Sequence, residues 1–254
     1  MNRIIRNLKI VTVALLALTT TQVSAQRLNT HNDIGWGAVF GNFAISKRLS
    51  VIPEFQWRRT HVVKDWQQLL ARGGVQYNFV KGGSVALLYA FINTYPYGDY
   101  PAGPHDVPEH RITEQAIFNG NTGIFAFTHR LRLEQRYLGR IDQKGETGEV
   151  EEWIYANRFR YMLRTDVPVS RPKMADKTFY LAAYDEIFIG FGKNVKQNVF
   201  DQNRLAVLAG YRFNKNIRVE AGYLNQIVQQ SGEINNQEVF QYNEGPLIHV
   251  FLTK

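Results

Sequence analysis

The sequence contains no cysteine, which excludes disulfide bonds and any metal site built on thiolates. It also lacks a long apolar run. The clearest run, Ile10 to Leu18, is much shorter than the roughly 20 apolar residues that a membrane-spanning helix needs. No later stretch has the apolar spacing of an amphipathic helix. With helices and covalent cross-links set aside, the fold has to be built from strands.

The amino-terminal end has the composition of an export signal. Basic residues precede the apolar run, and the small residues Val23 and Ala25 stand at the two positions that a signal peptidase reads. The pattern predicts a signal peptide over residues 1–25, cleaved after Ala25, and a single domain over residues 26–254. Because no cysteine follows the cleavage site, lipid attachment there is excluded.

The formal net charge of +8 is of the kind that suggests nucleic acid or an anionic surface as the partner. An exported chain does not meet nucleic acid, and the basic residues form no run with interleaved aromatic residues. They recur instead at every second position. The expected partners are therefore outer-membrane lipid and small anionic solutes, and no cofactor is expected.

The stretch Phe125 to Tyr137, FAFTHRLRLEQRY, has the clearest pattern in the chain. Every second residue from Phe125 is apolar or uncharged, and the intervening set includes Arg130, Arg132 and Glu134. A period of two predicts a strand with one apolar and one charged face. Such a strand fits a soluble sheet with one wet face, or a barrel wall with lipid outside and polar groups inside.

Eleven strands are legible in all, and several repeat this alternation. Bacterial single-chain barrels have even strand numbers, so we expect about 12 strands, with the leader before Ile34 supplying the twelfth, and ten as the alternative. The strand at Ser84 to Tyr95 is apolar on both faces. A bulge is expected at Asp185-Glu186, and a bulge or bend at Gly245-Pro246. The fold class is all-β, a single antiparallel transmembrane β-barrel.

The connections between these strands support the barrel. Short turns near residues 46–48, 81–83, 119–121 and 214–216 alternate with longer loops near residues 98–110, 138–150, 191–202 and 229–238. Outer-membrane barrels have short periplasmic turns and longer outer loops, whereas a soluble sandwich has no reason for this alternation. The segment 166–177 is an exception, because it is long where a short turn is expected. We therefore expect the protein in the outer membrane of a Gram-negative bacterium.

If lipid lies outside, the charged faces of the strands line the lumen. Arginine and glutamate side chains are then expected to cross-link neighbouring strands and plug a narrow barrel, which has an envelope-structural or transport role. Alternatively, an arginine-rich lumen would attract anions and form a small anion-selective pore. The expected lumen residues are Glu54, Arg58, Arg72, Arg130, Arg132, Glu134, Arg136, Arg158, Arg160, Arg164, Arg204, Arg212, Arg218 and Glu220.

Aromatic residues mark the two ends of the strands. Tyr137, Trp153 and Tyr155 stand where one strand leaves and the next one re-enters the membrane, and Tyr211 and Phe213 serve the opposite side. Aromatic side chains at these depths predict a girdle at the membrane–water interfaces.

Catalytic residues are not evident. A lipid hydrolase is the remote alternative, but the mature serines (Ser46, Ser50, Ser84, Ser170 and Ser231) stand at strand ends, turns or loops. His129 faces outward with no serine at a matching height, and hydrolases need such a pair. His105, Asp106, Glu109 and His110 have metal-binding side chains, but a solvated polar loop explains them better. We expect no enzyme and no metal site.

Four segments resemble one known family: HRLRLEQRY (His129–Tyr137), NRFRYMLR (Asn157–Arg164), AAYDEIFI (Ala182–Ile189) and NRLAVLAGYRFNKNIRVEAGYLNQ (Asn203–Gln226). The chain is similar to the domain of unknown function 2490 family, outer-membrane barrels of Bacteroidota-type bacteria, over most of residues 26–254. The resemblance implies the fold and the location. It implies no catalytic residue, because the family carries no established activity.

Overall fold

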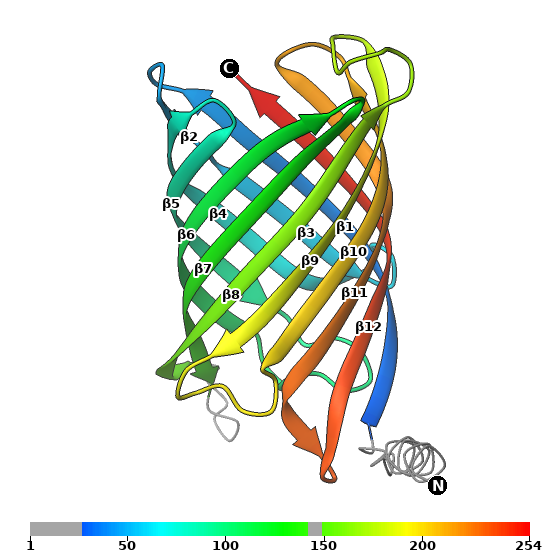
Figure 1. Cartoon of the computed structure of the whole chain (residues 1–254). Helices are drawn as coiled ribbons and strands as arrows, with labels where there is room; N and C mark the ends of the chain where they lie inside the picture. Colours follow the sequence, from blue (N-terminus) through cyan, green and yellow to red (C-terminus); the bar gives the residue numbers. More distant parts are fainter. Residues whose placement is uncertain (1–26, 142–148) are drawn as a thin grey trace, which may run out of the picture.

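The computed structural model describes residues 27–141 and 149–254. The signal peptide expected over residues 1–25 lies outside the described residues. All regular structure in the described part is β-strand, and the strands tilt around one closed wall (Figure 1). No helix in this part of the chain is long and apolar enough to cross a membrane.

The wall contains twelve strand segments, and all but one of the pairs that are consecutive in the chain are hydrogen-bonded to each other. They are β1 (Arg27–Ala44), β2 (Leu49–Val51), β3 (Glu54–Thr60), β4 (Asp65–Val80), β5 (Gly83–Thr94), β6 (Val107–Thr122), β7 (Phe125–Ile141), β8 (Val150–Pro168), β9 (Thr178–Phe191), β10 (Phe200–Arg212), β11 (Ile217–Ile234) and β12 (Gln237–Thr253).

The expected all-β barrel of about twelve strands is confirmed, although the twelfth segment has a different origin. β2 and β3 follow one another along the same path, because both pair with β1 and with β4. Pro53 separates them, and proline has no N–H to donate to a strand ladder. The leader before Ile34 is not a separate strand but the first part of β1. The barrel therefore closes with eleven strand paths.

The barrel closes between its first and last strands. β12 pairs with β1 in parallel, from Arg27 beside Glu238 to Asn42 beside Thr253, whereas the other pairings are antiparallel. An odd number of paths requires this parallel seam, because the first and last strands then run in the same direction (Figure 1). Gly245 lies in the seam, where a Cβ would meet the carbonyl oxygen of Ile34 at 1.9 Å.

The two faces of the wall have opposite composition. Glu134 and Glu220 are completely buried inside, whereas Leu87, Leu181 and Val207 are more than half exposed outside. β5 shows how its two apolar faces are used. Val85, Leu87, Tyr89 and Phe91 point outward, while Ala86, Leu88, Ala90 and Ile92 are buried inside. The alternation thus places the charged side chains in the interior.

The connections fall into two groups, one at each end of the barrel. The end that we call the turn end carries residues 45–48, 81–82, 123–124, 169–177 and 213–216, and the end that we call the loop end carries residues 61–64, 95–106, 192–199 and 235–236. β7 ends and β8 begins at the loop end. The long loop expected near 229–238 was wrong. β11 and β12 extend to a tight turn at Asn235 and Asn236, which both have positive φ.

Neither position that was expected to bulge has a register shift. At Asp185-Glu186 the register of β9 is regular against both of its neighbours, so the expected bulge there was wrong. Gly245 and Pro246 keep the register with β11. Against β1 they are unpaired, but the register is the same before and after them, so β12 has a break in pairing at the seam and no bulge.

Candidate functional site: a layered ionic lumen

The structure places the fourteen charged residues expected in the lumen on the inner face of the wall. Most are buried, and Arg212 and Arg218 are about one-third exposed near the turn end. The excess of arginine is smaller than the sequence suggested, because five further charged residues share the interior. These are Glu109, Arg111, Asp166, Glu186 and Asp201.

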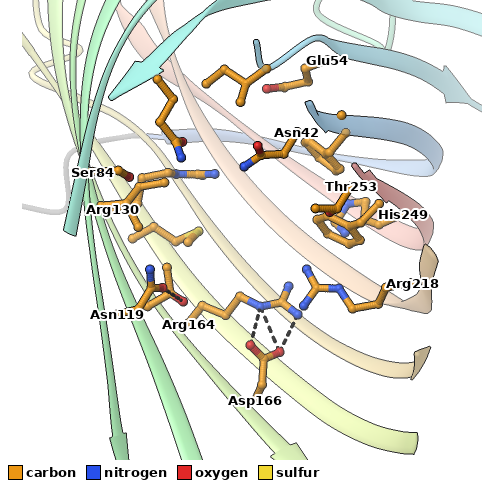
Figure 2. A pocket seen from close by; sticks show the side chains of 18 of the residues that line it. Asn42, Glu54, Ser84, Asn119, Arg130, Arg164, Asp166, Arg218, His249 and Thr253 are labelled. Atoms are coloured by element: carbon orange, nitrogen blue, oxygen red, sulfur yellow. Dashed lines mark hydrogen bonds and ion pairs between the residues drawn. The ribbon is translucent and has the colours of Figure 1, made fainter. Parts of the chain in front are cut away.

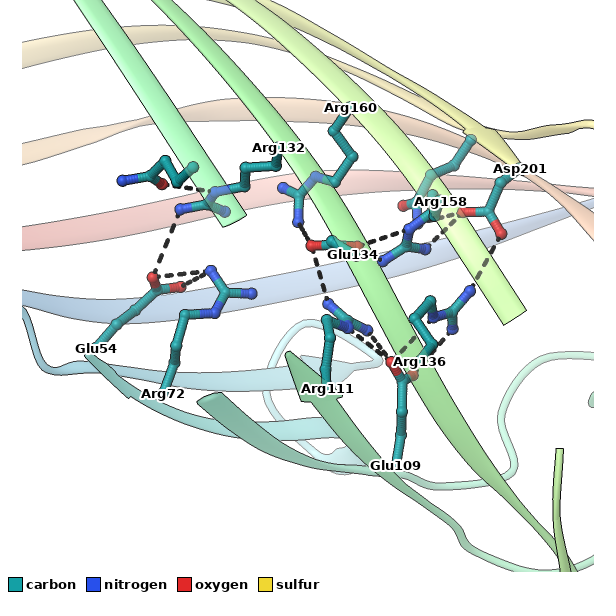
Figure 3. Close-up of polar contacts among 12 residues, drawn as sticks. Glu54, Arg72, Glu109, Arg111, Arg132, Glu134, Arg136, Arg158, Arg160 and Asp201 are labelled. Atoms are coloured by element: carbon teal, nitrogen blue, oxygen red, sulfur yellow. Dashed lines mark hydrogen bonds and ion pairs between the residues drawn. The ribbon is translucent and has the colours of Figure 1, made fainter. Parts of the chain in front are cut away.

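Glu134 on β7 is the centre of the interior network (Figure 3). Its carboxylate lies 2.6 Å from Arg160, 2.7 Å from Arg158 and 3.5 Å from Arg111. β6 and β8 flank β7, and Glu134 is in register with Arg158 on one side and Thr113 on the other. Three guanidinium groups thus converge on one carboxylate, which is completely buried.

The network continues toward the loop end through two more carboxylates. Glu109 lies 2.6 Å from Arg111 and 2.9 Å from Arg136. Asp201 at the start of β10 lies 2.6 Å from Arg158 and 3.7 Å from Arg136 (Figure 3). Charge-assisted ion pairs of this kind connect nearby strands along the inner face of the wall.

A second cluster lies nearer the turn end. Glu220 accepts hydrogen bonds from Arg164 at 2.5 Å and from the Tyr180 hydroxyl at 2.7 Å. Arg164 also pairs with Asp166 (Figure 2). Arg218 and His249 lie 3.7 and 3.5 Å from the Glu220 carboxylate. Glu186 extends the first network toward the turn end, because it pairs with Arg160 at 2.8 Å and with Arg130 at 2.9 Å.

Two buried arginines are exceptions. Among the described residues, no carboxylate forms an ion pair with Arg58 or Arg204. Arg58 donates to the side-chain oxygens of Gln56 and Gln68, at 3.0 and 2.5 Å. Arg204 donates to Gln202 at 2.9 Å, and its buried Nε has no acceptor. The hydrogen-bond acceptors of both guanidinium groups are thus uncharged glutamine side chains.

The lumen contains two cavities that meet at one layer. The turn-end cavity has a volume of about 780 Å³, and the loop-end cavity about 530 Å³. Six residues line both cavities, and we call them the guanidinium layer: Trp36, Gln56, Arg58, Arg132, Arg160 and Arg204.

The segment 95–106 covers the loop end. The Tyr97 hydroxyl donates to Gln241 at 2.9 Å and accepts from Asn243 at 3.2 Å, so it reaches from β5 across to β12. The carbonyl oxygen of Tyr100 accepts from Gln230 and Gln241. In Figure 1 this segment runs across the lower part of the barrel, near the loop end. The lumen is therefore narrowed at its middle and covered at one end.

The aromatic residues expected at the two interfaces lie on the outer face. Tyr137 and Tyr155 pack at 5.3 Å between ring centroids toward the loop end, and Trp153 is exposed beside them. Tyr211 packs against Phe213 at 4.7 Å toward the turn end. They form two groups, one on either side of the exposed apolar surface.

The residues considered for catalysis are not brought together. His129 contacts the Tyr161 hydroxyl at 2.8 Å, and none of the serines is its partner. Glu109 points inward to its arginines, whereas His110 contacts Tyr89 and Asp106 accepts from Asn93. Within residues 27–141 and 149–254, no group of three or more histidine or acidic residues is arranged to hold a metal ion.

The class defined by this geometry is a closed β-barrel with an ionic interior and an apolar exterior. The model of one family, described as a protein of unknown function (DUF2490), matches residues 34–238, so the chain belongs to that family. No curated protein and no solved structure matches the chain.

Proposed function

We propose that the protein is an integral barrel of the outer membrane, with a closed, arginine-rich lumen and an envelope-structural or transport role. The observation that carries the proposal is the inverted distribution of side chains. Glu134, Arg158 and Arg160 are buried, whereas Phe179, Leu181 and Val207 are at least half exposed. Water does not favour an apolar exterior of this size, but the hydrocarbon of a bilayer does.

The arrangement of the lumen supports a closed barrel over a freely conducting pore. The guanidinium layer separates the two cavities, and the segment 95–106 covers the loop end. Ion pairs across the interior resist separation, because removing one partner leaves a buried charge uncompensated. A transported solute would bind in a cavity and pass only when the layer rearranges. The proposal includes no catalytic residue and no cofactor.

Fractionation of the producing cells tests the location. After separation of the membranes on a density gradient, the chain should travel with outer-membrane markers. It should also change its mobility on a gel after boiling, because closed barrels resist detergent at room temperature. Recovery of the folded chain in the soluble periplasmic fraction would contradict the proposal.

A small anion-selective pore is the second candidate, and one observation favours it. Arg58 and Arg204 leave positive charge uncompensated at the junction of the two cavities. If purified protein conducts in a planar bilayer, a salt gradient should give a reversal potential that favours anions. Absence of conductance from folded protein supports the closed barrel, and cation preference would contradict the charge of the lumen.

A further inference from the structure

Arg58 and Arg204 reach one aromatic side chain from different parts of the wall. Arg58 comes from β3 and Arg204 from β10, and the Trp36 ring on β1 receives both. The guanidinium carbons lie 4.1 and 5.1 Å from its centroid. Trp36 is itself held by a 2.6 Å hydrogen bond from its Nε1 to Gln67. Both guanidinium groups are therefore placed against one fixed ring.

This pair differs from the rest of the interior in its partners. Arg158, Arg160 and Arg164 each pair with two carboxylates. Arg58 and Arg204 are only 6% and 9% exposed, yet glutamine oxygens are their hydrogen-bond acceptors. Two like charges that are buried together repel one another, and glutamine cannot neutralise either of them. Within the described part of the chain, neither guanidinium group has a carboxylate at ion-pair distance.

A path for a counter-ion is present. Arg58 and Arg204 both line the turn-end cavity, and that cavity extends to the turn residues Lys81 and Lys215. Arg130 and Arg218 line the same cavity between the turn end and the layer. The lining also includes Glu54, Asp166 and Glu186, but basic residues outnumber these acids. A cleft with an excess of one sign of charge raises the local concentration of the opposite ion. An anion that enters at the turn end is thus drawn toward the layer.

We propose that Arg58 and Arg204 form a binding site for a dissolved oxyanion of the phosphate type. The planar guanidinium group presents several N–H donors in a fork that matches the oxygens of a phosphate or carboxylate. The buried Nε of Arg204 supplies a donor that has no protein acceptor. The ligand is a solute and not a lipid headgroup, because the barrel wall separates this layer from the lipid.

The site rests on the closed lumen of the proposed function but not on its membrane location, so its test uses folded barrel in detergent. Isothermal titration with inorganic phosphate, in phosphate-free buffer at constant ionic strength, should show saturable binding. Sulfate should compete, and chloride at the same ionic strength should not. A gel of unboiled and boiled samples checks in parallel that the barrel is folded.

Arg58→Gln and Arg204→Gln should each weaken phosphate binding on the order of tenfold or more, since each removes a charged donor pair. Arg140→Gln is the matched control, because it removes the same charge from an exposed pair with Glu152. It should bind phosphate as the unchanged chain does. If a glutamine variant fails to fold, the lysine variant at the same position replaces it. The lysine keeps the charge but loses the planar fork of donors, so its phosphate affinity should be lower than that of the unchanged chain.

Three results would overturn the proposal: no saturable binding by folded protein, phosphate affinity in Arg58→Gln and Arg204→Gln that is unchanged from the original chain, or a loss of affinity in Arg140→Gln as large as in those two variants. The last result would show that phosphate binds through the overall positive charge of the protein and not at a specific site. Phosphate binding by a folded barrel that is absent from the outer membrane would keep this site and reject the location. A folded barrel that is found in the outer membrane but does not bind phosphate would keep the location and reject the site.

Discussion

The inner and outer faces of the barrel wall come from the same strands, yet they are stabilised in opposite ways. Leu131 and Arg132 are adjacent on β7. Leu131 is half-buried and lines an outer apolar groove, and Arg132 is 6% exposed in the interior. The inner face depends on charge pairing, whereas the outer face depends on its apolar surroundings. A substitution should therefore be costly for different reasons on the two faces.

The largest effect is expected at Glu134. Glu134→Gln leaves Arg111, Arg158 and Arg160 without their shared carboxylate, and breaking a buried pair in this way costs about 3–5 kcal/mol. Urea unfolding in lipid vesicles, followed by tryptophan fluorescence, measures the loss. Glu152→Gln is the control, because its pair with Arg140 is exposed and is worth at most about 1 kcal/mol. Equal losses in both variants would show that the inner network does not stabilise the barrel.

The next effect tests the outer face. Leu131→Arg places a charge on the apolar exterior, which costs roughly 2–4 kcal/mol near the middle of a bilayer. Arg132→Leu should cost less. Arg132 donates to Gln115 at 2.7 Å, and its carboxylate contact with Glu54 is a long 4.0 Å. The same unfolding experiment compares the two variants. A larger loss for Arg132→Leu would reverse the proposed orientation of the wall.

A smaller effect of opposite sign is expected at Glu114. This residue is exposed on the outer face of β6, in register with Leu87 and Leu133, and lines the same groove as Leu131. A carboxylate on an apolar wall is unfavourable, so Glu114→Leu should stabilise the barrel in lipid by roughly 1 kcal/mol. Unfolding of this variant in vesicles provides the measurement. Loss of stability would instead indicate a partner for Glu114 in the membrane.

The smallest perturbation uses labelling and not energy. The chain contains no cysteine, so single cysteines at positions 131 and 132 report on one face each. Cysteine 131 should react with a lipid-soluble maleimide, and cysteine 132 only with water-soluble reagents that reach the cavities. Labelling of position 132 from the lipid phase would show that the assigned register is wrong by one residue and that the inner and outer faces are exchanged.

The sequence was sufficient to predict where the strands lie and which residues line much of the inner face, because the period of two is visible within each strand. It was insufficient to predict strand ends, because several strands continue beyond the residues that show the apolar alternation. Glu109 and Asp201 were assigned to loops, but they stand near the first residues of β6 and β10 and pair inward. Their partners lie on other strands, so no local pattern marks them.

The pairing of charges was also beyond the sequence. A list of arginines cannot distinguish Arg160, which binds two carboxylates, from Arg58, which binds two glutamines. The difference depends on strand register and on side chains from distant segments. The carboxylate at position 186 did have a local signal, because two adjacent acids must point to opposite faces of a regular strand. Asp185 and Glu186 do so.

The parallel seam has a consequence for how the chain folds. Asn32 on β1 donates a hydrogen bond to Asn243 on β12, 211 residues away, whereas the other strands pair with near neighbours in the chain. Antiparallel hairpins therefore form from local contacts, but closure has to wait for the last strand to be made. Contacts of such long range are slow to form, and until then β1 and β12 present unpaired backbone edges. Closure of the seam is thus the folding step before which an unfinished barrel is most prone to aggregate.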